Sequence, residues 1–418
     1  MPTAKLVAAL ITILLSIVRV VPAQTYSVLH SFTGEHDGSH PLSGLVMDRA
    51  GNLYGTTSTG GNMQGVCGEV GGCGTVFRLS LKNGGWIFTT LYAFQGDYDG
   101  QTPQAPLTIG PDGALYGTTV YGGADSCTIG YGCGTVFKVT PPASFCGTAM
   151  CGWKETVLFR FPEGIDGIST PYGGVVFDEA GNLYGASFGG GIGICSYACG
   201  TIYELIPSGN GHWGLTPLYE FTGGADGASP MSTLLRDSRG NLYGTAYAGG
   251  FNQYGTVFEL SPSGQNWTFK LLHEFQGESD GQFPMTALVM DAAGNLYGDN
   301  TDGGPNGGGV VFQLSPFGNG WSFQVVDSPT GGVTGPVNLD NVGNVYGTTG
   351  GGGSSNEGRV FKLAKNGNSW LEQNLHSFNG ADGATPYSGV IFDSAGRLYG
   401  TTDWGGGNQV GVVWEIAP

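Results

Sequence analysis

The chain has 418 residues, of which 80 are glycine and only 11% are charged, and its formal net charge is −17. Such an acidic surface repels phosphate backbones, which excludes nucleic acid as an expected partner. Abundant glycine, threonine, valine and aromatic residues favour short strands joined by tight turns over a helical fold.

The first residues read as an export signal. Lys5 precedes an apolar run over 6–18, which is too short for a membrane span of about 20 residues. Small residues at 21–23 then fit a cleavage site. We expect a signal peptide over 1–23, with an uncleaved N-terminal anchor as the alternative, and one domain over 24–418. The protein is therefore expected to be secreted, either extracellular or periplasmic, with no later membrane span.

One repeat accounts for the remaining chain. The segment 51–57, Gly-Asn-Leu-Tyr-Gly-Thr-Thr, recurs with changes, and each copy is followed by a Gly-Gly pair and a segment resembling Gly-Thr-Val-Phe. Successive copies are 49 to 68 residues apart. Such internal repetition indicates a solenoid, a propeller or an array. The repeated tyrosine gives seven copies: Tyr54, Tyr116, Tyr184, Tyr243, Tyr297, Tyr346 and Tyr399.

Each copy predicts four short strands, which we name a to d. In the first copy they cover 44–47, 53–57, 75–79 and 86–94. The residues Asp48 to Asn52 have the turn chemistry of an a–b hairpin, because Asp, Gly and Asn tolerate the backbone conformations that tight turns need. Four strands in each of seven copies predict an all-β, seven-bladed β-propeller.

The two ends of the chain favour a closed ring. The segment 26–32 is similar to strand d at 374–378, whereas the last copy stops after its Gly-Val-Val-Trp strand without a strand d. We expect the N-terminal strand to complete the last blade, which would also leave no sheet edges open to aggregation.

The pattern Asp-Gly…Pro, Asp-x-x-Gly-Asn-Leu-Tyr-Gly-Thr-Thr, Gly-Gly, Gly-Thr-Val-Phe resembles the bacterial Gloeo-Verruco (GloVer) tandem repeat over essentially the whole chain after residue 23. The resemblance implies an exported propeller-like protein. It implies no particular reaction, because the family has no generally assigned activity.

In a propeller, the d–a and b–c connections share one face, and two features fall there. The first is an Asp-Gly motif in six d–a loops, which is either turn chemistry or a ring of carboxylates at the channel mouth that binds Ca²⁺ or a cationic ligand. The sixth blade has Gly331-Gly332-Val333 instead. The six aspartates are Asp37, Asp99, Asp166, Asp226, Asp280 and Asp382.

The second feature is a set of longer, cysteine-bearing b–c loops in the first three blades. An even number of cysteines in an exported chain indicates disulfides, and neighbouring cysteines are the economical pairing. The loops either add local stability or form a rigid rim that recognises a partner. The expected pairs in these loops are Cys67/Cys73, Cys127/Cys133 and Cys195/Cys199, and the fourth expected pair, Cys146/Cys151, lies outside them.

Aromatic residues on the same face suit stacking against sugars, with packing between blades as the alternative. The candidates are Tyr121, Tyr131, Phe188, Tyr197, Tyr247, Phe251 and Trp404.

Two further groups carry weaker signals. The segment His36-Asp37-Gly38-Ser39-His40 could hold a metal. His30, His273 and His376 occupy one repeat position and are expected to pack strands. Acids peculiar to single blades lie near the same face, but no motif pairs them: Asp125, Asp299, Asp302, Glu357 and Asp403.

The sequence favours a non-catalytic binding or scaffold protein that recognises carbohydrate or a protein partner through this face. The alternatives are a carbohydrate-active or lyase-type enzyme that uses the same face, and a structural surface or matrix component. Whether the protein is an enzyme stays open, with the balance against it, and fold alone does not decide among these functions. We expect a monomer without a firmly predicted cofactor, Ca²⁺ being the one candidate.

Overall fold

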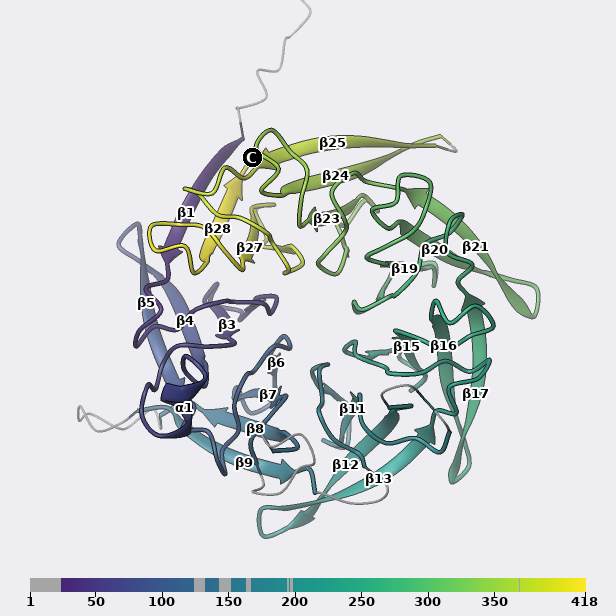
Figure 1. Cartoon of the computed structure of the whole chain (residues 1–418), viewed down its shortest axis with the longest axis horizontal. Helices are drawn as coiled ribbons and strands as arrows, with labels where there is room; N and C mark the ends of the chain where they lie inside the picture. The colour runs from purple at the N-terminus through teal and green to yellow at the C-terminus, as the bar shows by residue number, and fades with distance from the viewer. Residues whose placement is uncertain are drawn as a thin grey trace, which may run out of the picture.

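The computed structural model describes residues 24–123, 132–142, 152–162, 167–193, 195, 198–367 and 369–418. The expected signal peptide lies outside them. The described strands form seven four-stranded antiparallel sheets, arranged radially around a central opening (Figure 1). The prediction of a seven-bladed β-propeller is confirmed.

The first blade shows the pattern that the others repeat. Strands a to d are β2 (Val46–Met47), β3 (Leu53–Thr57), β4 (Thr75–Lys82) and β5 (Gly85–Ala93). Strand b has its predicted bounds, strand a is shorter than predicted, and strand c is longer because it continues into a tight hairpin with strand d. The pairing order is β2-β3-β4-β5, from the channel outward.

The second to sixth blades are built in the same order. The second and third are β6 (Thr108–Ile109), β7 (Leu115–Thr119), β8 (Thr135–Thr140), β9 (Lys154–Arg160), then β10 (Val176–Phe177), β11 (Leu183–Ser187), β12 (Thr201–Gly209) and β13 (His212–Glu220). The fourth and fifth are β14 (Leu235–Arg236), β15 (Leu242–Ala246), β16 (Thr256–Ser263), β17 (Asn266–Glu274), then β18 (Val289–Met290), β19 (Leu296–Asp299), β20 (Val311–Phe317) and β21 (Gly320–Asp327). The sixth is β22 (Asn338–Leu339), β23 (Val345–Thr349), β24 (Arg359–Asn366) and β25 (Ser369–Ser377).

The two ends of the chain close the ring in the seventh blade. Its strands are β26 (Ile391–Phe392), β27 (Leu398–Thr402), β28 (Val412–Ala417) and, as strand d, β1 (Thr25–Ser31). β1 pairs antiparallel with β28, from Thr25 opposite Ala417 to Ser31 opposite Val412. Tyr26 of β1 also stacks on His376 of the sixth blade, with ring centroids 3.8 Å apart. The predicted closure is therefore confirmed.

The apolar core lies between neighbouring blades. Each b strand is fully buried, and the first interblade cluster joins Tyr54 and Val76 of one blade to Leu115 and Phe137 of the next. Inside each blade the repeated glycine of strand b faces the aromatic residue of strand c. A Cβ on Gly55 would lie 2.6 Å from the ring of Phe77, so this contact requires the glycine of the Tyr-Gly-Thr sequence.

The a–b turns explain the repeated Asp-x-x-Gly-Asn sequence. Asp48 accepts hydrogen bonds from the backbone N–H of Ala50 and Asn52 and from the side chains of Asn52 and Tyr54. Burial alone would raise the pKa of Asp48, but these donors lower it below its ordinary value. The motif is structural, as the sequence predicted.

Candidate functional site

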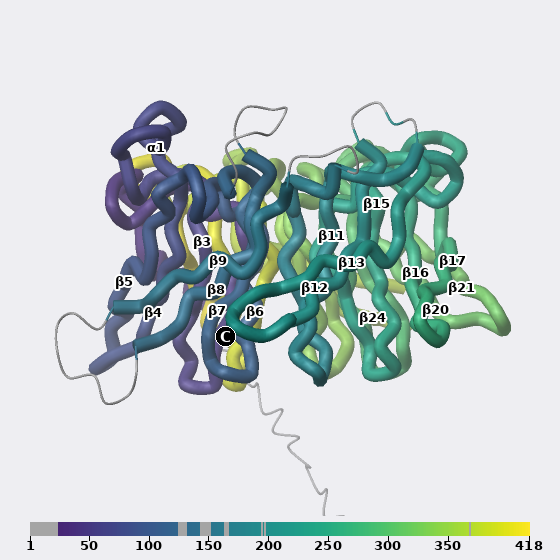
Figure 2. Tube along the Cα trace, turned by 90° about the horizontal axis from the view of Figure 1, so that it is seen from below, coloured from purple at the N-terminus to yellow at the C-terminus, as the bar shows by residue number. Residues whose placement is uncertain are grey.

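The d–a and b–c connections lie together on one face of the disc. The single described helix, α1 (Val66–Glu69), belongs to the b–c connection of the first blade and marks this face in Figure 2. The a–b and c–d turns lie on the opposite face.

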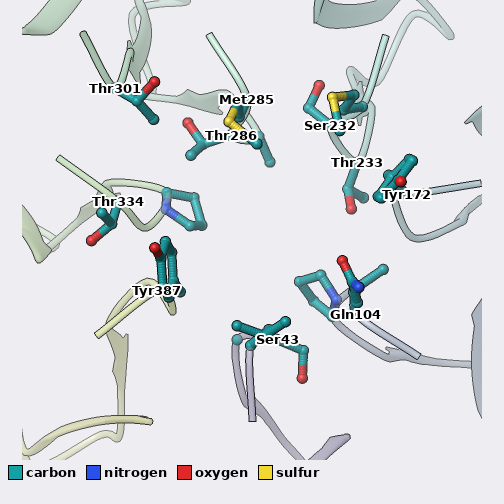
Figure 3. Close-up of a pocket in the computed structure, with 18 of the residues that line it drawn as sticks. Ser43, Gln104, Tyr172, Ser232, Thr233, Met285, Thr286, Thr301, Thr334 and Tyr387 are labelled. Atoms are coloured by element: carbon teal, nitrogen blue, oxygen red, sulfur yellow. The ribbon is translucent and has the colours of Figure 1, made fainter. Parts of the chain in front are cut away.

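A pocket of about 450 Å³ opens at the centre of the d–a/b–c face, where all seven blades contribute to its wall (Figure 3). We call it the channel mouth. Its main lining comes from the repeat position four residues before each strand a. That position holds seven side chains of five kinds: Leu42, Gln104, Tyr172, Met231, Met285, Thr334 and Tyr387.

The local backbone aims this position at the channel. In the first blade His40 has a left-handed φ of 56°. Its N–H donates to the carbonyl of Val410 in the seventh blade, and its own carbonyl accepts from Ser58 of the first. The same left-handed conformation recurs at Thr102, Thr170 and Ser229. Such a conformation costs energy for a residue other than glycine, and here hydrogen bonds to two blades hold it. The result is a rigid frame on which the next residues can vary.

The lining is mostly neutral. Behind the variable position stand hydroxyl groups, among them Ser43, Ser232 and Thr286. Tyr172 is hydrogen-bonded to Tyr121 and half-buried, and burial, followed by the influence of Tyr121, raises the pKa of Tyr172 to about 12. Tyr172 therefore presents a neutral phenol near pH 7.

One charged group breaks this pattern. Asp403, directly after β27, lines the channel mouth, and its Oδ1 lies 2.9 Å from Nδ1 of His40. The His40 ring packs edge-to-face on Trp404, with centroids 4.5 Å apart. These residues lie where the last blade meets the first. His40 and Asp403 are 363 residues apart in the sequence, so their contact could not be predicted from it.

A second acid lies behind the wall in the fifth blade. Asp299 is 1% exposed, its Oδ2 accepts from the N–H of Val337 at 3.3 Å, and its Oδ1 has no hydrogen-bond partner. Burial raises its pKa to about 7. Thr286, whose Oγ1 is also unpartnered, separates it from the channel mouth.

The described aromatic candidates lie behind or beside the channel mouth and do not line it. Phe188 packs against Tyr172 at 5.8 Å, and Tyr247 stacks on Phe283 at 5.0 Å. The contacts of Tyr247 with Phe283 and of Tyr121 with Tyr172 join neighbouring blades, which is the packing that the sequence left as the alternative, whereas Phe188 packs within the third blade. Trp404 and Phe251 are 48% and 87% exposed. Tyr131 and Tyr197 lie outside the described residues.

The Asp-Gly aspartates lie at the ends of the outer strands, and none of those described lines the channel mouth, contrary to the placement that the calcium hypothesis assumed. Asp280 accepts from the N–H of Gln276 and Gly277 and lies 2.9 Å from Nε2 of His273. The His273 ring in turn stacks on Phe323 of the next blade at 3.8 Å. The same turn geometry holds Asp37, Asp99, Asp226 and Asp382, whereas Asp166 lies outside the described residues.

The described residues do not form the cluster of ligands that either predicted metal site would need. His36 and His40 do not converge on Asp37, because Asp37 pairs with His30 and His40 pairs with Asp403. Across the described part of the chain, no three His, Cys, Asp or Glu side chains gather as a metal site would require. Calcium binding by the Asp-Gly aspartates stays a prediction.

The remaining single-blade acids do not join the site. Asp302 is exposed, Glu357 contributes its backbone carbonyl to Thr385, and Asp125 lies outside the described residues.

Two of the predicted disulfides are present, Cys67–Cys73 and Cys195–Cys199. Cys133 is also disulfide-bonded, while Cys127, Cys146 and Cys151 lie outside the described residues. The Cys67–Cys73 bridge lies beside Phe94 and Gly96, at the outer end of strand d. The bridged loop therefore stiffens the outer rim and not the channel mouth.

Sequence reasoning missed the channel mouth because it searched for residues that recur. The informative signal was a repeat position that does not recur: its residue varies from blade to blade, whereas the neighbouring residues form the same turn.

Among solved structures, one matches the fold of this chain with a TM-score above 0.5. The extracellular domain of a candidate one-component system from B. thetaiotaomicron matches with a TM-score of 0.53 at 10% identity, over 88% of this chain and 37% of that one. A candidate 6-phosphogluconolactonase from Bacteroides uniformis gives 0.49 at 15% identity, over 80% and 84%. A candidate glucose dehydrogenase from Thermus thermophilus gives 0.46 at 14%, over 82% and 100%. At these identities the likeness concerns the fold alone.

No helix in the described ranges is long and apolar enough to cross a membrane. No curated protein matches the sequence. The model of one repeat family matches residues 16–151 and 128–335, more than half of the chain. The chain therefore belongs to the Gloeobacter/Verrucomicrobia repeat family.

Proposed function

We propose that the protein is an exported, non-catalytic recognition module that binds a carbohydrate at the channel mouth. The observation that supports this proposal best is that the turns around the pocket repeat from blade to blade, whereas the side chains they present to the pocket vary. Seven blades present the same turn, yet the position facing the pocket holds Leu, Gln, Tyr, Met, Met, Thr and Tyr. A merely structural ring has no need for such differences, whereas an asymmetric ligand does.

The chemistry of the lining supports a sugar. Tyr387 is 42% exposed and offers a ring face, and Met285 adds apolar surface. Gln104, Ser43 and the threonines offer neutral donors and acceptors. No Lys or Arg is among the described lining residues, so a phosphate or carboxylate ligand would lack a counter-charge. The volume of about 450 Å³ falls within the range of small-ligand pockets.

Export is inferred from the disulfides and from the leader-like residues 1–23. Disulfides persist in oxidising compartments and are rare in the cytosol. A periplasmic or extracellular site is consistent with a glycan ligand.

The contact between His40 and Asp403 favours the enzyme alternative. A carboxylate that orients a histidine is a common arrangement for general base catalysis. The enzyme alternative would replace the proposal if the protein turned over a bound glycan and if His40→Gln abolished that turnover while binding persisted.

A glycan-array screen of the purified protein, with and without Ca²⁺, tests the proposal. Selective binding should weaken about tenfold or more in Tyr387→Ala, because a stacked ring contributes on the order of 1–2 kcal/mol. Phe317→Ala is the matched control, since Phe317 is 76% exposed on a c–d turn of the opposite face. Absence of any selective glycan, or equal loss in both variants, would overturn the proposal.

A further inference from the structure

The channel mouth holds a single charged side chain among its described lining residues, that of Asp403. Asp403 lies four residues after the repeated tyrosine of strand b, where the other six blades place Ser58, Val120, Phe188, Tyr247, Thr301 and Gly350. A charge at this position is thus peculiar to the seventh blade. Neither the turn nor the sheet requires it.

The carboxylate of Asp403 is only partly satisfied. His40 Nδ1 lies 2.9 Å from Oδ1, whereas Oδ2 accepts a hydrogen bond from none of the described residues. The Asp403 residue is 7% exposed, and Oδ2 is not among the unpartnered side-chain atoms that are shut off from solvent, so it retains some contact with water. Within the described part of the chain no Lys or Arg forms an ion pair with it.

A largely buried carboxylate that has no Lys or Arg partner is costly, and a cation supplied by a ligand lowers that cost. The net charge of −17 also draws cations toward the surface. The exposed ring of Tyr387, which lines the pocket in the same blade, offers a further face that attracts cations. Neutral groups make up the rest of the described lining, so Asp403 would dominate recognition of a charged substituent.

We infer that the ligand of the channel mouth carries a protonated amine that pairs with Oδ2 of Asp403, which makes it an amino sugar. The inference rests on the proposed carbohydrate function and specifies its ligand class. His40 holds Oδ1 and thereby fixes the carboxylate, so that Oδ2 is presented to the amine. The N-acetylated form of the same sugar lacks the charge and would lose this pairing.

The test is calorimetric titration at about pH 6, where a sugar amine is protonated. Three tetramers serve as probes: β-1,4-linked glucosamine, its N-acetylated form and β-1,4-linked glucose. The wild-type protein should bind the glucosamine tetramer about tenfold more tightly than either neutral tetramer, and added salt should reduce that preference. In Asp403→Asn the preference should fall to about twofold or less, with affinity for the neutral tetramers unchanged.

Asp302→Asn is the matched control, because Asp302 is an exposed acid just after strand b of the fifth blade and does not line the pocket. It should retain the preference. Equal binding of all three tetramers by wild-type protein would overturn the inference and leave carbohydrate recognition standing. A preference that survives in Asp403→Asn would also overturn it, whereas failure of every glycan would remove the proposed function itself.

Discussion

Replacement of Asp299 by threonine should stabilise the protein, increasingly so as pH rises. In five blades the equivalent residue is a threonine, and its Oγ1 donates to a carbonyl of the next blade; Thr118, for example, donates to Gly173 at 3.0 Å. In the fifth blade the position holds a buried acid whose Oδ1 lacks a partner. The variant restores a neutral donor that can reach the carbonyl of Gly335.

The magnitude follows from the raised pKa of Asp299, about 7 against an ordinary value of 3.8. Between these values the folded state retains a proton that the unfolded chain releases. Wild-type stability therefore falls as pH rises through this window and levels off above it. A difference of about three units at 1.36 kcal/mol per unit gives a loss of about 4 kcal/mol above pH 7.

Urea unfolding at about pH 5 and pH 8 measures the effect. The advantage of Asp299→Thr over wild type should grow by about 2 to 3 kcal/mol between the two pH values. Asp302→Asn, which removes an exposed acid of the same blade, should leave the wild-type pH dependence intact. An advantage that is the same at both pH values would show that Asp299 does not hold a proton in the folded state.

Three further outcomes are expected. Tyr26→Ala should destabilise the ring by about 3 kcal/mol in thermal unfolding, because Tyr26 of the closing strand β1 stacks on His376 of the sixth blade; an unchanged melt would contradict closure by β1. Replacing Cys67 and Cys73 by serine should cost about 2 kcal/mol in urea unfolding but leave glycan affinity unchanged, and a loss of affinity would move the site to the outer rim. Asp280→Ala should lower the free energy of unfolding by about 2 kcal/mol, because the hydrogen bonds that hold the turn are lost. If the role of Asp280 is confined to the turn, a chelator should leave the melting temperature of the wild-type protein unchanged; a melting temperature that falls with chelator would support calcium binding.

The architecture was predictable because repetition multiplies a weak local signal. One Asp-x-x-Gly-Asn turn says little, but seven turns with the same Tyr-Gly-Thr strand predict seven blades, and the spare N-terminal strand predicts closure. The limits of strand a could not be read, since only two residues, such as Val46–Met47, pair with strand b.

The site was less predictable because its contacts join distant parts of the chain. His40 and Asp403 meet only after ring closure, and Asp299 becomes unusual only when burial removes water from it. The sixth blade illustrates the same point. Where the Asp-Gly motif is missing, the preceding strand d carries Asp327 at a position that holds histidine, tyrosine or phenylalanine in the other blades. The charges of Glu372 and Arg359 act on Asp327.

Hydrogen–deuterium exchange with and without a bound glycan tests the central claim most directly. The account predicts that the glycan protects the segments before the a strands, such as 42–44, 104–106 and 285–287, together with the seam at 403–404. Protection confined to the bridged b–c loops at the outer rim, or to the c–d turns of the opposite face, would contradict binding at the channel mouth.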